Sequence, residues 1–124
     1  MIPLRLSTGP ARRAKYGNRK VPASDGGKPF DSAAEARRYG QLVLLQRAGQ
    51  ITELRRQVAY ELVPAQRDGA GKAVRAVSYV ADFVYLDQTG QTVVEDVKGV
   101  TTAEYRLKAK LMLWRHGVEV QEVR

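Results

Sequence analysis

Two runs of apolar and β-branched residues, 77–86 and 91–97, dominate the middle of the chain. The four residues between them, Asp87-Gln88-Thr89-Gly90, are typical of a hairpin loop, and Gly90 supplies the positive φ that such a loop usually needs. The sequence therefore predicts a β-hairpin over residues 77–97.

The rest of the pattern predicts two helices, two further strands and one loop. One helix opens at Asp31-Ser32-Ala33-Ala34-Glu35 and is ended by Gly49, and a second opens at a Thr101–Glu104 capping box and is ended by Gly117. Apolar residues at even positions predict a strand over 51–63. Residues 64–72 read as a flexible loop, and 118–123 as a closing strand.

Apolar spacing also predicts which helix faces are buried. Tyr39 and Leu42 share a stripe on the first helix. On the second helix, the core stripe is expected to consist of Leu107, Leu111 and Trp114. Trp114 is thus predicted to be a core residue.

The expected order is helix, three strands, helix, strand. This order predicts an α/β domain over residues 31–124, with a small mixed sheet and a helix on each side. Residues 1–30 are interrupted by Pro and Gly too often for a long helix and are read as a separate basic arm.

Composition narrows the class of protein. A chain of 124 residues has room for one core, and the absence of cysteine excludes disulfides and thiolate metal sites. A single histidine excludes multi-histidine zinc sites. No apolar run approaches the roughly 20 residues of a membrane span, and no signal-peptide core is visible, so we expect a cytoplasmic protein with no membrane partner.

Charge favours a polyanionic partner. The chain has 21 Lys and Arg against 13 Asp and Glu, a net charge of +8. Basic residues with an aromatic residue among them suit phosphates and stacked bases, although a solubilising tail is an equal alternative for the arm. The candidate DNA-binding residues are Arg12, Arg13, Lys15, Tyr16, Arg19 and Lys20 in the arm, and Tyr105 and Lys108 on one flank of the second helix.

Two acids mark the predicted hairpin as a candidate site. Folding it about residue 89 places Asp82 opposite Asp96, and such neighbours lie roughly 5 Å apart at Cβ. Lys98 points to the same side, so Lys98 or a divalent cation would offset the repulsion between the acids. Because apolar residues accompany the acids on their face, we favour a site over the alternative of a solvated face.

Glu35 and Gln57 are open to two interpretations. Glu35 has capping-box spacing to Ser32, so its role could be to cap the helix. It also lies on the core-facing stripe, which would direct its carboxylate toward the sheet. Gln57 could line a cleft, but we expect an ordinary polar residue of an edge strand.

Four blocks of sequence together resemble small phage-encoded proteins of the PD-(D/E)xK nuclease superfamily. The blocks are Lys15-Tyr16-Gly17-Asn18, Phe30-Asp31-Ser32 with Glu35-Ala36, Tyr79-Val80-Ala81-Asp82-Phe83, and Val94-Glu95-Asp96-Val97-Lys98-Gly99. The resemblance covers about residues 15–123. It implies a restriction-endonuclease-like αβββαβ core, although Ala81 stands where the superfamily has Pro.

The resemblance implies a metal-dependent DNA endonuclease. Selectivity for branched or flapped DNA is one substrate preference that it allows. Asp82, Asp96, Glu35 and the Val97 carbonyl would bind Mg²⁺ or Mn²⁺, and Lys98 would complete the catalytic set. Dimers are common among relatives that cut branched DNA, so a homodimer is one form to test. The alternative function is a DNA-binding accessory protein that keeps the scaffold and does not cut.

Overall fold

The computed structural model describes residues 19–23 and 26–124. The chain divides into two compact units, Met1–Gly40 and Gln41–Arg124. Helix α2 (Ala33–Arg47) contributes residues to both units. Within the described residues, no helix has the length and apolar character that crossing a membrane would require.

The described part of the first unit is built around the start of α2. Val21 and Phe30 form an antiparallel bridge through two backbone hydrogen bonds of 2.8 and 2.7 Å. At the helix start, the Ser32 hydroxyl accepts a hydrogen bond from the Glu35 amide at 3.1 Å. The Glu35 carboxylate in turn accepts a hydrogen bond from the Asp31 amide at 3.1 Å. The backbone amides of Asp31 and Glu35 therefore both have side-chain acceptors at the start of the helix.

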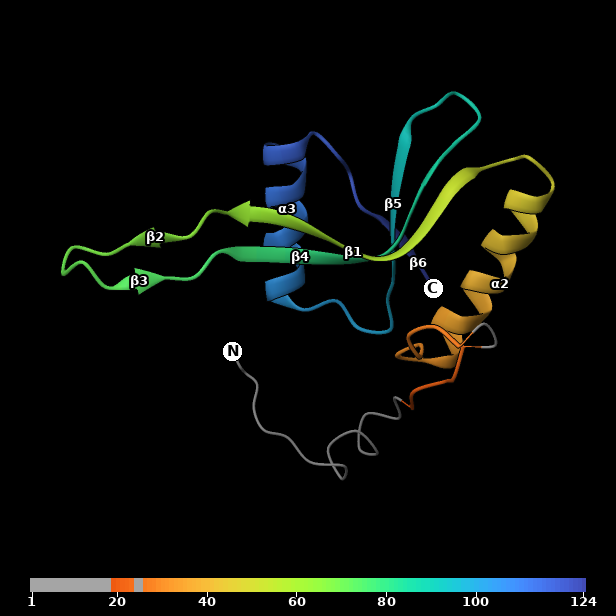
Figure 1. Cartoon of the computed structure of the whole chain (residues 1–124), viewed down its shortest axis with the longest axis horizontal. Helices are drawn as coiled ribbons and strands as arrows, with labels where there is room; N and C mark the ends of the chain where they lie inside the picture. Colours follow the sequence, from red (N-terminus) through yellow and green to blue (C-terminus); the bar gives the residue numbers. More distant parts are fainter. Residues whose placement is uncertain (1–18, 24–25) are drawn as a thin grey trace. The chain divides into compact units, whose positions relative to one another are not determined.

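The second unit is organised around a four-stranded mixed sheet (Figure 1). Its strand order is β1-β4-β5-β6, where β1 is Thr52–Val63, β4 is Val77–Leu86, β5 is Thr92–Val97 and β6 is Gln121–Val123. The first three strands are antiparallel neighbours, and β6 runs parallel to β5. Helix α3 (Ala103–His116) makes the crossover that a parallel pair needs. For the four strands of this sheet and the two helices, the predicted order of helix, three strands, helix and strand is confirmed, with two further short strands, β2 and β3, between β1 and β4.

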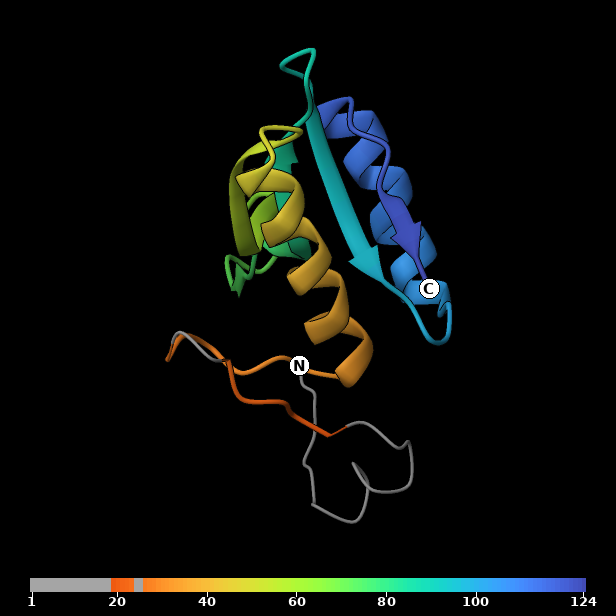
Figure 2. The same ribbon diagram turned by 90° about the vertical axis from the view of Figure 1, so that its right-hand side faces the viewer.

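The core of this unit lies between α3 and the sheet. A cluster of buried side chains joins the two layers: Leu62, Tyr79, Ala81, Val84, Val94, Tyr105 and Met112. Figure 2 shows α3 running alongside β5 and β6. Burial of this apolar surface is the main term that stabilises the unit.

The predicted core stripe of α3 is wrong in part. Leu107 is 58% exposed and Trp114 is 78% exposed, whereas Tyr105 and Met112 are buried. Both pairs have the same seven-residue spacing, and residues two positions apart on a helix point about 200° apart. Spacing alone therefore could not decide which of the two faces meets the sheet.

The ends of α3 are set by its flanking residues. Thr102 is the N-cap, and its hydroxyl accepts a hydrogen bond from the Tyr105 amide at 3.1 Å. The predicted box of Thr101 and Glu104 is thus one residue out of register, and Glu104 pairs with Lys108 at 3.2 Å instead. Gly117 ends the helix in the left-handed conformation (φ 67°), as predicted.

Residues 64–72, which were predicted to be a flexible loop, and the following residues 73–76 do not form a loop. They form a narrow extension of β1 and β4 in which β2 (Gln66–Arg67) pairs with β3 (Ala73–Val74). We call residues 64–76 the arm ribbon. Each of its strands has two residues, which is too short to give an alternating apolar signal, and this explains why the pattern suggested a loop.

The backbone of β1 is irregular. Glu53 (φ 56°) and Gln57 (φ 53°) adopt the left-handed conformation, and the register with β4 shifts between Thr52 and Arg55. A side chain in this conformation costs roughly 1–2 kcal/mol relative to an extended residue. The strain at Gln57 coincides with the candidate site.

Candidate active site

Asp82 and Asp96 lie on the two strands of the β4–β5 hairpin, one step beyond the last pair. Phe83 pairs with Glu95, so Asp82 and Asp96 occupy the next opposing positions. The Asp82 carboxylate reaches across to β5, where Oδ2 accepts a hydrogen bond from the Val97 amide at 2.8 Å. The predicted alignment of the two acids agrees with this register.

Asp96 is buried and paired with a lysine. Its side chain is 7% exposed, and its Oδ2 lies 2.8 Å from Nζ of Lys98. The same ammonium lies 3.8 Å from the centre of the Tyr105 ring, which adds a cation–π contact. Lys98 is therefore held between a carboxylate and an aromatic face that come from two different elements.

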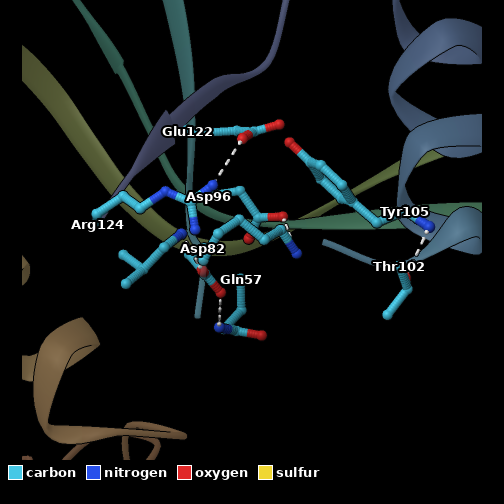
Figure 3. Close-up of polar contacts among 9 residues, drawn as sticks. Gln57, Asp82, Asp96, Thr102, Tyr105, Glu122 and Arg124 are labelled. Atoms are coloured by element: carbon cyan, nitrogen blue, oxygen red, sulfur yellow. Dashed lines mark hydrogen bonds and ion pairs between the residues drawn. The ribbon is translucent and has the colours of Figure 1, made fainter. Parts of the chain in front are cut away.

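The polar residues extend across the whole sheet in one row (Figure 3). Gln57 lies opposite Asp82 between two recorded pairs of β1 and β4, and its Nε2 donates to Asp82 Oδ1 at 3.4 Å. Glu122 of β6 is in register with Asp96. Its carboxylate lies 3.8 Å from Nη2 of Arg124. One row thus carries Gln57, Asp82, Asp96 and Glu122.

Two of these contacts differ from what the sequence indicated. Gln57 was expected to be an ordinary edge residue, but it contacts Asp82 because its position opposes that aspartate. Glu122 was not singled out at all. Its place beside Asp96 depends on the register of a three-residue parallel strand that is far away in the sequence, and no local pattern encodes that register.

Two buried tyrosines bring hydroxyl groups to the same side of the sheet. Burial raises the pKa of Tyr79 well above its ordinary value, and the charge of Asp96 raises that pKa further. Burial, followed by the charge of Glu122 and then of Asp96, raises the pKa of Tyr105. Neither hydroxyl meets the geometry of a hydrogen bond to another described residue, although the Asp96 carboxylate beside Tyr79 and the Glu122 carboxylate beside Tyr105 both contribute to the raised pKa values. Both groups therefore stay protonated and can donate a hydrogen bond to a ligand.

A pocket of about 400 Å³ opens beside Asp96 and Lys98. Its wall combines hydroxyl groups, ammonium groups and one further acid, contributed by Ser78, Tyr79, Val80, Thr102, Glu104, Tyr105 and Lys108. Tyr105 and Lys108 were expected to share a DNA-facing flank of the helix, and both line this pocket. An anionic group that entered it would meet several hydroxyl donors and two lysines, each of which pairs with an acid of the same wall: Lys98 with Asp96 and Lys108 with Glu104.

The remaining predicted residues belong to the first unit or lie outside the described residues. Glu35 is buried at 2% exposure in the first unit, where it contributes the capping contact with the Asp31 amide, and its role as a metal ligand stays a prediction. Lys20 is exposed and pairs with Asp31 at 3.3 Å, and Arg19 is also exposed. The other candidate arm residues lie outside the described residues: Arg12, Arg13, Lys15 and Tyr16.

The carboxylates of Asp82 and Asp96 are the metal-ligating side chains that the site offers. Hard cations such as Mg²⁺ prefer oxygen ligands and keep several waters, so two carboxylates on adjacent strands fit such an ion. Within residues 19–23 and 26–124, no group of three or more His, Cys, Asp or Glu side chains is placed to hold a metal. Further ligands would be backbone oxygens, waters or substrate, together with Glu35 if its predicted role holds.

Comparison with known proteins bears on the family of the chain. A family model described as "Protein of unknown function (DUF1064)" matches residues 13–123. The chain belongs to this family. The match includes the whole β4–β5 hairpin, Lys98 and β6, so the row of polar residues falls inside the DUF1064 region. No curated protein and no solved structure matches the chain.

Proposed function

We propose that this member of the DUF1064 family is a metal-dependent DNA endonuclease built on a restriction-endonuclease-like core. The observation that carries the proposal is the buried Asp96 beside Asp82, with Lys98 2.8 Å from the Asp96 carboxylate. Two acids and a lysine at the divergent end of a hairpin match the residues through which the sequence resembles the PD-(D/E)xK superfamily. The net charge of +8 supports a nucleic acid as the substrate.

The acids would hold the metal. Asp82 and Asp96 are the proposed ligands, with the Val97 carbonyl and Glu35 as further candidates. When bound, a divalent ion supplies Lewis-acid stabilisation of phosphoryl oxygens and lowers the pKa of its water.

The other residues of the pocket would bind and orient the substrate. Lys98 would place its charge beside the scissile phosphate, since Asp96 and the Tyr105 ring fix its position. The Tyr79 and Tyr105 hydroxyls stay protonated because their pKa values are raised, so each would donate a hydrogen bond to a phosphate oxygen. Lys108 lines the same pocket and would contact a neighbouring phosphate.

The test is the Asp96→Asn variant in a cleavage assay on linear, nicked, flapped and four-way DNA with Mg²⁺. We expect cleavage to fall at least about 100-fold, because an amide is a poor metal ligand, while DNA binding persists. Asp87→Asn is the matched control, since Asp87 lies at the tip of the same hairpin and should retain activity. A variant Asp96→Asn that cleaves within about tenfold of wild type would exclude Asp96 from the reaction.

Lys98 is a poorer first target than the acids. Removing its ammonium would leave Asp96 buried without a counter-ion, which costs about 3–5 kcal/mol when a buried pair is broken. Loss of activity would then be confounded with loss of the fold. Asp96→Asn breaks the same pair, but it leaves an amide of the same size beside Lys98, which is the more exposed partner at 18% and keeps the Tyr105 ring. A thermal melt checks that the variant is folded.

A non-cleaving DNA-binding protein is the second candidate. The observation that favours it is that both acids have protein partners, because Asp96 pairs with Lys98 and Asp82 accepts hydrogen bonds from Val97 and Gln57. In that case Mg²⁺ would not stabilise the protein. For the nuclease, Mg²⁺ at about ten times its Kd should add about 1.5 kcal/mol to the free energy of unfolding.

A further inference from the structure

The arm ribbon extends beyond the rest of its unit. Strand β5 pairs only with residues 83–86 of β4, so the first half of β4 is paired with β1 alone. Residues 64–76, between the end of β1 at Val63 and the start of β4 at Val77, continue these two strands as a ribbon. Figure 1 shows this ribbon reaching past the sheet and α3. Every residue from 64 to 78 is exposed, so the ribbon contributes nothing to the core.

The tip of the arm ribbon is nevertheless held in one conformation. Asp68 Oδ1 accepts hydrogen bonds from the amides of Ala70 and Lys72, each at 2.9 Å. The Arg67 guanidinium donates to the Gly71 carbonyl at 2.9 Å. A tip that is already ordered loses little conformational entropy when it binds a partner.

The charge of the arm ribbon is available for a partner. It carries Arg67, Lys72 and Arg75, and its one acid, Asp68, is engaged in the turn. None of the three cations is in an ion pair with another described residue. In contrast, Lys98, Lys108 and Arg115 each pair with an acid.

We propose that the arm ribbon inserts into the major groove of duplex DNA. Paired strands lie about 4.8 Å apart, and a two-stranded ribbon fits a groove about 12 Å wide, whereas the minor groove of about 6 Å is too narrow. The three cations contact the phosphates that border the groove. The proposal rests on DNA as the partner of the proposed function, and it does not depend on cleavage.

The first experiment measures how salt weakens duplex binding, in EDTA so that no cleavage occurs. Replacing Arg67, Lys72 and Arg75 together by Gln removes three phosphate contacts. The slope of log K against log salt should therefore fall by about 2.7, at about 0.9 per contact. The matched control replaces Arg37, Arg47 and Lys110, three exposed cations on the two helices, by Gln. A slope that changes equally in both triple variants would overturn the proposal.

The second experiment locates the tip on the DNA. The chain has no cysteine, so Ala70→Cys provides a unique attachment point for an iron–EDTA cleavage group. A tip in the major groove cuts the two strands at positions offset toward their 5′ sides, whereas a tip in the minor groove gives a 3′ offset. Gln88→Cys, at the exposed tip of the β4–β5 hairpin, is the control. A 3′ offset, or cutting at Ala70→Cys no stronger than at Gln88→Cys, contradicts the proposal.

The two proposals can fail separately. If wild type binds duplex DNA with the expected dependence on the arm ribbon but never cleaves, the proposal for the arm ribbon is supported and the proposed endonuclease function is rejected. If wild type cleaves while the triple variant of the arm ribbon keeps the full salt slope, the proposed endonuclease function is supported and the proposal for the arm ribbon is rejected. If wild type does not bind duplex DNA, the proposal for the arm ribbon is overturned, and the cleavage assay with Mg²⁺ decides the endonuclease separately.

Discussion

The arm ribbon and the β4–β5 hairpin are closed by the same turn. In each, an aspartate carboxylate accepts hydrogen bonds from the amides two and four residues later: Asp68 from Ala70 and Lys72, and Asp87 from Thr89 and Gln91. A glycine follows three residues after each aspartate, Gly71 with φ 80° and Gly90 with φ 84°. The two regions therefore share the hydrogen bonding of the turn, although the strands that flank it differ in burial and charge.

The strands that leave each turn make the difference. The β4–β5 hairpin buries Phe83, Val84 and Val94 completely and has no Lys or Arg between Arg75 and Lys98. The arm ribbon is exposed throughout and carries three cations. One turn thus serves both a hairpin that positions acids within the sheet and a ribbon that presents positive charge away from it.

The largest expected effect separates chemistry from binding. Asp82→Asn should reduce Mg²⁺-dependent cleavage about 100-fold, a barrier change of about 2.7 kcal/mol, while it keeps an acceptor for the Val97 amide. Replacing residues 66–74 by Asn-Gly should instead raise KM and leave kcat within about threefold, because the arm contacts substrate equally in ground and transition states. Steady-state kinetics on one duplex substrate measure both effects. A large loss of kcat on shortening the arm would show that the two regions are not functionally distinct.

The next effect concerns burial. The Tyr85 hydroxyl donates a hydrogen bond to the buried Glu95 carboxylate. Tyr85→Phe should lower the free energy of unfolding by about 1–3 kcal/mol, since it removes a donor from a buried charge. Val74→Ala in the arm ribbon, at a residue that is 40% exposed, should change stability by less than about 0.5 kcal/mol. Urea unfolding measures the free energy of unfolding of both variants. Equal losses of that free energy would contradict the conclusion that the arm ribbon is independent of the core.

The two turn glycines provide a closer comparison. A Cβ at Gly90 or at Gly71 would meet nothing within 4 Å, so Ala at either position introduces only the strain of a positive φ. That strain is about 1–2 kcal/mol. We expect Gly90→Ala to lower global stability by this amount. Gly71→Ala should destabilise the arm ribbon locally and leave the free energy of global unfolding nearly unchanged, because the arm ribbon can unfold while the core stays folded.

Hydrogen exchange at the Lys72 amide should show this local effect of Gly71→Ala. Protection there should fall while protection in β5 stays at the wild-type level. If Gly71→Ala lowered global stability as much as Gly90→Ala does, the arm would be part of the cooperative core.

The smallest effect is a pH dependence of the β4–β5 turn. The pKa of Asp87 is lowered from its ordinary value of 3.8, first by the Thr89 hydroxyl and then by the Gln91 amide. A lowered carboxyl pKa in the folded state means that the stabilisation is present above the unfolded value and is lost as pH falls through the folded value. The difference in unfolding free energy between wild type and Asp87→Asn should therefore shrink between about pH 5 and about pH 3. A constant difference across that window would contradict the role of the charged carboxylate.

The same comparison shows what could be predicted from the sequence. The β4–β5 hairpin was predicted because a turn sequence and long apolar strands agreed with each other. The arm ribbon has an equivalent turn, Asp68-Gly69-Ala70-Gly71-Lys72, but its flanking strands have only two residues each, so no strand pattern supported the turn. The alignment of Asp82 with Asp96 followed from the loop length, because pairing within a hairpin is local.

Features that depend on distant parts of the chain could not be predicted. Glu122 joins the row because β6 pairs with β5 after a helical crossover, and no pattern near Glu122 specifies that register. Leu107 and Trp114 have helical spacing equal to that of Tyr105 and Met112, so only packing against the sheet decides which pair is buried. The function of Glu35 depends on contacts beyond its own helix and stays a prediction.

The irregular backbone of β1 has a consequence for the protein at high concentration. Strand β1 is an edge of the sheet and is twelve residues long, and a second molecule can add a strand to a long, regular edge. The left-handed residues Glu53 and Gln57 interrupt the regular alternation of amide and carbonyl groups along that edge. A strand from another molecule could therefore not pair along its full length. The strain in β1 should protect the protein against edge-to-edge aggregation, in addition to placing Gln57 beside Asp82.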